Sequence, residues 1–183
     1  RNPQAIYACD PVLGSATSGC FVAPEVQTLI RDRVVPQADL ITPNQFELGF
    51  ITGTDPHTLD ETLTSVDLVR AEGPSTVLVT SVFRPDRPED TIEMLAVTDD
   101  GAWIVQTPQL PFKRNGSGDV AAALFSSHFR SSGDPAKALG RTAASVYELL
   151  RNTFEADSRE LLLIESQEAY VAPQTTFEVR QVR

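Results

Sequence analysis

Short apolar runs alternate with amphipathic segments along most of the chain. The run at 76–80 is continuous, apolar and rich in β-branched residues, as expected of a strand buried on both faces of a parallel sheet. The segment 59–72 carries apolar residues at helical spacing and ends at Gly73-Pro74, which predicts a helix. The same criteria predict strands at 6–9, 39–41, 93–97, 102–106, 161–165 and 176–182, and helices at 24–34, 44–51, 118–129 and 135–151.

The order of these elements predicts one α/β domain over residues 1–183, with a central, mostly parallel sheet flanked by helices. Asp99-Asp100-Gly101 lies between two strand runs and is typical of a hairpin turn. The segment 167–171 is left unassigned. In sheets of this kind, ligands bind outside the carboxyl ends of the strands. Three expected strands end in polar residues, which should lie side by side on one rim: Asp10-Pro11, Thr42 to Glu47, and Thr80-Ser81.

Composition narrows the function classes. The 183 residues are 41% hydrophobic and 22% charged, as in an ordinary soluble globular protein, and no apolar run approaches the length of a membrane span. The formal net charge of −10 argues against nucleic-acid binding and requires local donors or metal ions wherever a phosphate ligand binds. Cys9 and Cys20 are the only cysteines, and a reducing cytoplasm is the simplest interpretation.

The sharpest motif is Asn115-Gly116-Ser117-Gly118-Asp119, which precedes a run of small and apolar residues. Glycines before a helix let backbone N–H groups converge on an anion, and the helix dipole favours negative charge there. An aspartate in the first turn is suited to accept a proton from an incoming hydroxyl. The alternative is an ordinary glycine-rich turn in which the aspartate only favours the start of the helix.

The polar strand ends allow two interpretations each. Asn44 and Glu47 share a helix face and are suited to hold water around Mg²⁺, or they form a capping box at the start of the helix; both can hold together. Asp10 could lie near a metal or phosphates, or simply form a turn before proline. Thr80 and Ser81 offer hydroxyls to phosphate oxygens, or mark the change from strand to loop.

Other chemistries lack support in the sequence. His57 and His128 have no neighbours that form a metal-ligand pattern. The chain contains no Cys-x-x-Cys motif, no Gly-x-Ser-x-Gly nucleophile elbow and no Walker pattern.

Taken in order, these motifs resemble the pyridoxal kinases, a family of vitamin kinases with the ribokinase-like fold. The resemblance runs through nearly the whole chain, and its last motif is shared across the ribokinase superfamily. The motifs that carry it are Cys9-Asp10-Pro11-Val12-Leu13-Gly14, Ile41-Thr42-Pro43-Asn44-Gln45-Phe46-Glu47-Leu48, Val77-Leu78-Val79-Thr80-Ser81, Gly116-Ser117-Gly118-Asp119 and Ala144-Ser145-Val146-Tyr147-Glu148-Leu149-Leu150.

The resemblance implies a three-layer ribokinase-like fold and a role for each matching residue. Asp119 matches the catalytic base, and Gly116, Ser117 and Gly118 match the anion hole. The positions that match contacts with the nucleotide phosphates and Mg²⁺ are Asp10, Thr42, Asn44, Glu47, Thr80 and Ser81, with Asp10 and Glu47 at the metal. Leu150 matches a residue of the adenine pocket.

The implied activity is transfer of the ATP γ-phosphoryl group to the 5′-hydroxyl of pyridoxal, pyridoxine or pyridoxamine. The implied ligands are ATP with Mg²⁺ and a B6 vitamer, and neither nucleic acid nor a membrane is an expected partner. The full-length protein is expected to be a homodimer in the cytoplasm. A requirement for a monovalent cation is left open. Two alternatives remain: a hydroxymethylpyrimidine kinase of the same superfamily, which shares two of the motifs, and a fragment that binds nucleotide without turnover.

The chain departs from the family in two ways. Family members extend further at the N-terminus, so we expect residues 1–183 to form the C-terminal, ATP-binding portion of the kinase domain, without much of the vitamin pocket. Arg114-Asn115 stands where the family often has apolar residues near adenine, which leaves the packing of adenine in question. The same pair also makes a sugar kinase less favoured, because an Asp-Thr pair usually precedes the glycines there.

Overall fold

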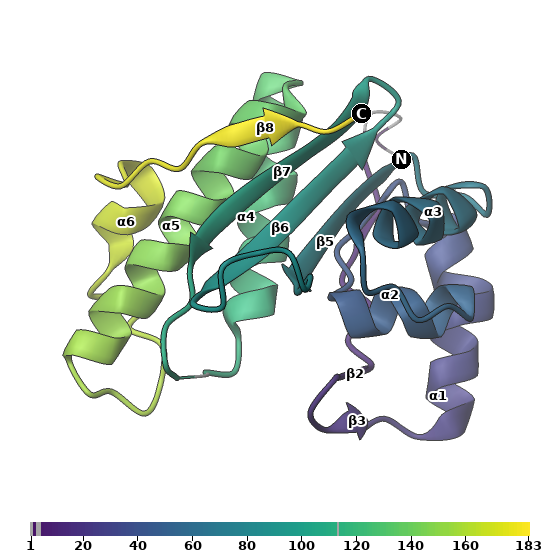
Figure 1. The fold of residues 1–183 in the computed structure, drawn as a ribbon, viewed down its shortest axis with the longest axis horizontal. Coiled ribbons are helices and arrows are strands. Elements are labelled where there is room, and N and C mark those ends of the chain that lie inside the picture. The colour runs from purple at the N-terminus through teal and green to yellow at the C-terminus, as the bar shows by residue number, and fades with distance from the viewer. Residues whose placement is uncertain (1, 3–4, 113) are drawn as a thin grey trace.

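The computed structural model describes residues 2, 5–112 and 114–183 (Figure 1). Within them, six strands form one sheet in the order β1-β4-β5-β6-β7-β8. The first three of these strands are parallel neighbours, and the remaining pairings are antiparallel. The strands are β1 (Ala8–Cys9), β4 (Leu40–Ile41), β5 (Thr76–Val82), β6 (Thr91–Thr98), β7 (Gly101–Pro108) and β8 (Val179–Gln181).

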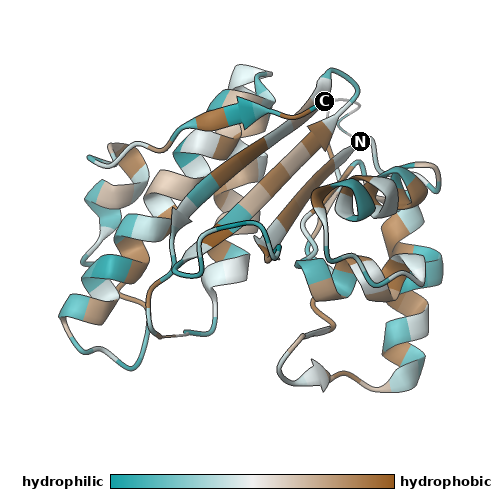
Figure 2. Cartoon of the chain, viewed as in Figure 1, coloured by the Kyte–Doolittle hydropathy of each residue, from teal (hydrophilic) through white to brown (hydrophobic). Residues whose placement is uncertain are grey.

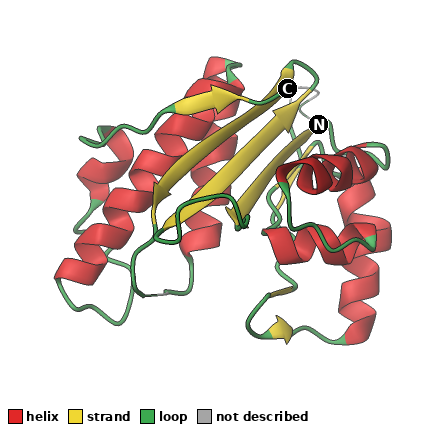
Figure 3. Cartoon of the chain, in the orientation of Figure 1, coloured by secondary structure: helices red, strands yellow, loops and turns green. Residues whose placement is uncertain are grey.

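Helices cover both faces of this sheet, which confirms the predicted α/β class (Figure 1, Figure 3). The helices are α1 (Pro24–Leu29), α2 (Gln45–Thr52), α3 (Leu59–Arg70), α4 (Ser117–Ser132), α5 (Pro135–Glu155) and α6 (Gln167–Val171). Helix α1 continues through the π-helical turn η1 (Ile30–Val34) and the 3₁₀ turn η2 (Val35–Gln37). A small hairpin of β2 (Gly14–Ser15) and β3 (Gly19–Cys20) follows β1.

Strand β5 shows why the sequence forms three layers. Val77 and Val79 are fully buried in a cluster with residues of α2 and α3, whereas Leu78 between them is fully buried against α4 and α5. Successive side chains of a strand point to opposite faces, so a continuous apolar run fits a strand covered on both sides. Figure 2 shows the resulting apolar centre of the sheet.

One predicted strand, 161–165, is wrong. The segment forms a turn in which the amide of Ser166 donates to the carbonyl of Leu162 at 2.9 Å, and Ile164 is 75% exposed. The open edge of β7, which the segment would have needed, is already paired with β8. The unassigned segment 167–171 forms the short helix α6.

The described residues contain two free thiols, Cys9 and Cys20. Burial, helped by the charge of nearby Asp10, raises the pKa of the Cys9 thiol to about 11, so this cysteine stays protonated at neutral pH. None of the helices within the described ranges combines the length and the apolar character needed to cross a bilayer.

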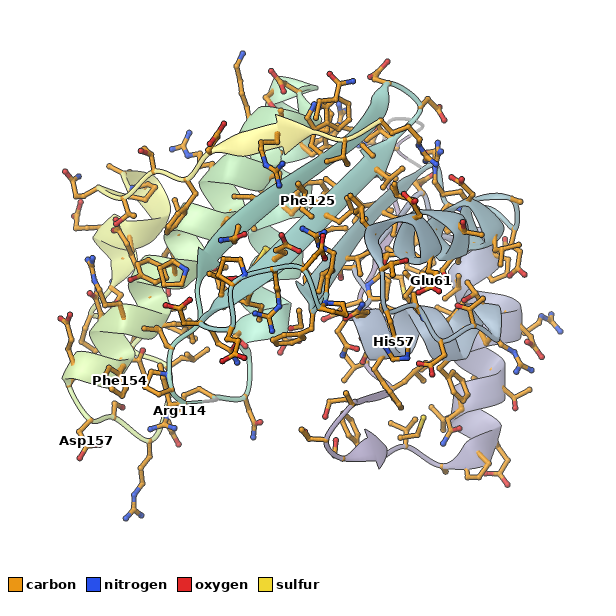
Figure 4. All side chains as sticks on the ribbon, in the orientation of Figure 1. His57, Glu61, Arg114, Phe125, Phe154 and Asp157 are labelled. Carbon is orange, nitrogen blue, oxygen red and sulfur yellow. The ribbon has the colours of Figure 1, made fainter. Side chains whose placement is uncertain are left out.

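Phe125 provides a test of the three-layer packing. Its side chain is fully buried between α4 and the sheet, and its ring stacks on Phe129 with 5.8 Å between centroids (labelled in Figure 4). Phe125→Ala should lower the free energy of unfolding by about 3–5 kcal/mol, because it leaves a cavity in the core. Urea unfolding checks this, with the 62% exposed Phe21 as the control: Phe21→Ala should shift stability by less than about 0.5 kcal/mol. Equal effects of the two changes would contradict this packing.

Candidate active site

The three polar strand ends meet on one rim, as the sequence predicted. The hydroxyl of Thr42, after β4, donates to Oδ1 of Asp10, after β1, at 3.1 Å. The amide of Thr80, near the end of β5, donates to the carbonyl of Pro43 at 2.9 Å, and Thr80 forms a parallel bridge with Asn44. Short β1 and β4 therefore carry their polar residues to the same edge as β5.

Glu47 holds the segments that form this rim together by hydrogen bonds. Its side chain is only 4% exposed, and its carboxylate accepts three backbone N–H groups: Leu13 at 2.9 Å, Gly14 at 3.2 Å and Asn44 at 2.8 Å. The side chain of Asn44 accepts from the amide of Glu47 and donates to the carbonyl of Gly14. The capping box predicted for these two residues is confirmed, and it also ties α2 to the loop that follows β1.

Two carboxyl groups of the rim are shifted toward the protonated form. Burial raises the pKa of Asp10; the hydrogen bond from Thr42 opposes this, and the negative charge of Asp119 adds to it. Burial also raises the pKa of Glu47 against the effect of its three backbone donors, and the charge of Asp10 raises it further. The three carboxyl groups are thus coupled electrostatically, Asp119 with Asp10 and Asp10 with Glu47, and a bound cation would relieve their repulsion.

The glycine motif forms the start of α4 and faces this rim. Gly116 is the N-cap residue with φ of 92°, in the left-handed region that favours glycine. Helices α2, α3 and α5 are capped by side chains of Asn44, Thr58 and Asp134, whereas Gly116 has no side chain that could cap α4. A methyl group built on Gly118 would lie 3.9 Å from Oδ2 of Asp10, so the backbone of the motif lies beside the Asp10 carboxylate.

Asp119 lies in the first turn of α4, and its side chain is exposed. An exposed carboxylate next to helix N–H groups can take a proton from a bound hydroxyl while those groups hold an anion. The predicted position of Asp119 in the first turn of a helix is confirmed, and its role as the base stays a prediction.

The end of β5 is distorted where its hydroxyls lie. Ser81 has φ of 52°, and the pairing of β5 with β6 shifts register between Val79 and Val82. A non-glycine residue in the left-handed region carries a conformational cost, which is commonly found at functional sites. Thr80 is buried, and Ser81 is half-buried. The sequence indicated two hydroxyls at the end of this strand, but it gave no sign of the backbone distortion there.

Leu150 is half-buried on α5. None of the hydrogen bonds or ring contacts described for the chain joins it to the glycine motif, so its role at adenine stays a prediction. The sequence marked Arg114 only as a departure from the family and gave no sign of the contacts around it. Leu161 packs against Gly116, and Arg114, which precedes the motif, contacts Phe112 and Ser158, with Phe112 in turn against Phe154.

The donor set suits Mg²⁺ bound through few protein ligands. Across the described ranges, no group of three or more His, Cys, Asp or Glu side chains is arranged to hold a metal ion. Asp10 and Glu47 supply hard oxygen ligands, and Mg²⁺ usually binds through one or two carboxylates with water and phosphate oxygens completing its shell. The residues present therefore fit Mg²⁺ that arrives with a phosphate ligand.

Known proteins resemble this chain over nearly its full length. Residues 1–162 match the family model described as phosphomethylpyrimidine kinase. A pyridoxal kinase PdxY of Leifsonia xyli subsp. xyli is 65% identical over 99% of this chain, and one of Corynebacterium diphtheriae is 58% identical over 99%. The chain spans 64% of the length of both curated relatives.

The fold agrees with that of a solved kinase. The structure of pyridoxal kinase from Leishmania donovani in complex with ADP and ginkgotoxin superposes with a TM-score of 0.87 at 25% identity, covering 98% of this chain and 62% of that one. The resemblance to pyridoxal kinases and the ribokinase-like fold predicted from the motifs are therefore confirmed. With most of its length matched by the family model, this chain belongs to the phosphomethylpyrimidine kinase family.

Proposed function

We propose that residues 1–183 form the nucleotide-binding portion of a pyridoxal kinase, which transfers the ATP γ-phosphoryl group to the 5′-hydroxyl of a B6 vitamer. The observation that carries this is the placement of an exposed Asp119 and the glycine motif beside the Asp10 carboxylate. Support for the substrate comes from the two relatives named pyridoxal kinase PdxY, at 65% and 58% identity.

The chemistry asks mainly for positioning and charge stabilisation. Asp119 accepts the proton of the attacking hydroxyl on its exposed carboxylate. The backbone N–H groups of Gly116, Ser117 and Gly118 donate to the oxygens of the transferred group, and the positive end of the 16-residue helix α4 favours the charge that collects there.

The rim holds the remaining phosphates. The hydroxyls of Thr80 and Ser81 and the second hydrogen of the Asn44 side-chain amide offer donors to phosphate oxygens. Thr42 orients the Asp10 carboxylate through its hydroxyl, and Leu150 contributes to the adenine pocket. Asp10 and Glu47 would hold Mg²⁺, either directly or through its water shell. When bound, Mg²⁺ neutralises phosphate charge that would otherwise face Asp10, Glu47 and Asp119.

Assembly and compartment follow from the same family resemblance. We expect the full-length protein to form a homodimer. The free thiols of Cys9 and Cys20 support a reducing, cytoplasmic compartment.

The second candidate is a hydroxymethylpyrimidine kinase, favoured by the description of the matching family model. Steady-state rates with pyridoxal and with the hydroxymethylpyrimidine separate the two candidates. We expect kcat/KM to be at least about tenfold higher for pyridoxal, since discrimination of this size requires only about 1.4 kcal/mol. The reverse preference would replace the proposal with the second candidate, and turnover of neither compound would leave a protein that only binds nucleotide.

Asp119→Asn tests the assignment of the base. The change keeps the size of the side chain but removes most of its basicity, so kcat should fall by about 10²–10⁴-fold while ADP still binds. Asp100→Asn, in the exposed turn between β6 and β7, is the control and should keep its rate. A near-normal kcat in Asp119→Asn would remove Asp119 from catalysis.

Glu47→Gln tests the metal assignment against a matched control. Glu61 fills the same position in the capping box of α3, where it accepts the amides of His57 and Thr58 (Figure 4). Both changes should lower stability, because a carboxylate acceptor is lost in each: Glu47→Gln by about 1–3 kcal/mol, since Glu47 is buried, and the exposed Glu61→Gln by less. Only Glu47→Gln should raise the Mg²⁺ concentration needed for the half-maximal rate. A metal titration unchanged from that of Glu61→Gln would place Glu47 outside the metal site.

A further inference from the structure

The glycine motif is joined to a part of the chain some forty residues away in sequence. Nε of Arg114 donates to the carbonyl of Ser158, 44 positions along the chain, at 2.8 Å. The guanidinium of Arg114 lies 4.8 Å from the centroid of the Phe112 ring, and that ring contacts Phe154 with 5.2 Å between centroids. We call Phe112, Arg114, Phe154 and Ser158 the clamp; Figure 4 shows Arg114 and Phe154 at the same end of the molecule.

The chain after α5 is shaped to present the carbonyl of Ser158. Asp157 has φ of 50°, a left-handed conformation that aspartate tolerates better than most residues. The amide of Ser158 then donates to the carbonyl of Thr153 at 3.1 Å. This turn directs the chain back toward the glycine motif, and Asp157 is labelled in Figure 4 beside Arg114.

Two further contacts reach the motif, one from Arg114 of the clamp and one from Leu161. The hydroxyl of Ser117 donates to the carbonyl of Arg114 at 3.3 Å, which closes the turn that contains Gly116. A methyl group built on Gly116 would lie 3.3 Å from Cδ1 of Leu161, so that side chain packs against the glycine. The motif therefore has α4 on one side and the segment 154–161 on the other.

Glycines allow the motif to adopt the backbone conformation that binds an anion, but they also allow many other backbone conformations. A backbone with two glycines loses more conformational entropy on ordering than other sequences, and this loss would weaken anion binding if it occurred at the binding step. A motif that is already held in place binds without that loss. Arg114 suits the task, because its planar guanidinium can stack on a ring and donate to a carbonyl at the same time.

We propose that the clamp holds the glycine motif in its anion-binding conformation, and that Arg114 is a positioning residue for the nucleotide phosphates. Arg114 acts through the backbone of Gly116 to Gly118. The inference rests on the proposed function for the identity of the anion, and it adds a device outside the motif that sets nucleotide affinity.

Two variants distinguish an effect of the clamp's packing and hydrogen bonds from an effect of the positive charge of Arg114. Arg114→Met keeps the length of the side chain and removes both the hydrogen bond to Ser158 and the positive charge. Phe154→Leu removes the ring that supports Phe112 without changing any charge, at a side chain that is 44% exposed. Arg141→Met is the matched control, because Arg141, on α5, likewise donates to the carbonyl of a residue distant in sequence, that of Val171, at 2.7 Å.

All measurements use the full-length protein. They are ADP affinity by calorimetry, KM and kcat for ATP from steady-state rates, and hydrogen exchange of the backbone amides at 115–118. In Arg114→Met we expect ADP affinity to fall and KM for ATP to rise by about tenfold, kcat to change less than about twofold, and exchange at 115–118 to rise about tenfold. Phe154→Leu should change the same quantities in the same direction, by less. Arg141→Met should leave all of them unchanged.

Each remaining outcome overturns the clamp. If Arg114→Met weakens ADP binding but Phe154→Leu leaves affinity and exchange unchanged, charge alone explains the effect. If both variants bind ADP like the parent, the motif needs no brace, and the proposed kinase function stands without it. If the parent itself does not bind ADP, the proposed function fails, and the clamp has no nucleotide to position.

Discussion

The buried carboxylate of Glu47 is the interaction on which the rest of the site depends. It gathers the amides of Leu13, Gly14 and Asn44, which belong to the loop after β1 and to the start of α2. A carboxylate in this position is costly to bury unless each oxygen is hydrogen-bonded, and here each of its oxygens accepts at least one backbone donor. Because those donors come from two separate segments, Glu47 fixes how β1 and β4 present Asp10 and Thr42 on the rim.

The electrostatics of the rim follow from that arrangement. Burial is the main cause that raises the pKa of Asp10, and the charge of Asp119 adds to it, while the charge of Asp10 in turn helps to raise the pKa of the buried Glu47. In a chain of net charge −10, such a cluster repels a polyphosphate unless compensating charge is supplied. The start of α4 supplies backbone donors and dipole, and a divalent cation supplies the rest. The acidic residues of the rim can therefore lie in the same site as a bound phosphate.

Much of this could be predicted from the sequence because the signals are local. The run that contains Val77, Leu78 and Val79 predicted a strand covered on both faces, and Asn44 with Glu47 predicted a capping box. The alignment of polar strand ends also followed, since parallel strands bring their carboxyl ends to one edge. These features depend on residues close together in sequence or on general rules of sheet geometry.

The rest depends on tertiary contacts that carry no local pattern. The apolar segment 161–165 has the composition of a strand, but the edge of β7 is paired with β8 instead. The left-handed Ser81 and the hydrogen bond from Arg114 to Ser158 arise from packing between distant segments. Arg114 stood out in the sequence only as a departure from the family, and the structure shows what it contacts.

If the rim and the start of α4 together receive the phosphates of a nucleotide, a crystal structure of the protein with Mg²⁺ and a non-hydrolysable ATP analogue will show it. The terminal phosphate should lie at the amides of Gly116 to Gly118, with the metal beside Asp10. A terminal phosphate bound away from these amides, or a metal without contact to Asp10 either directly or through water, would contradict it.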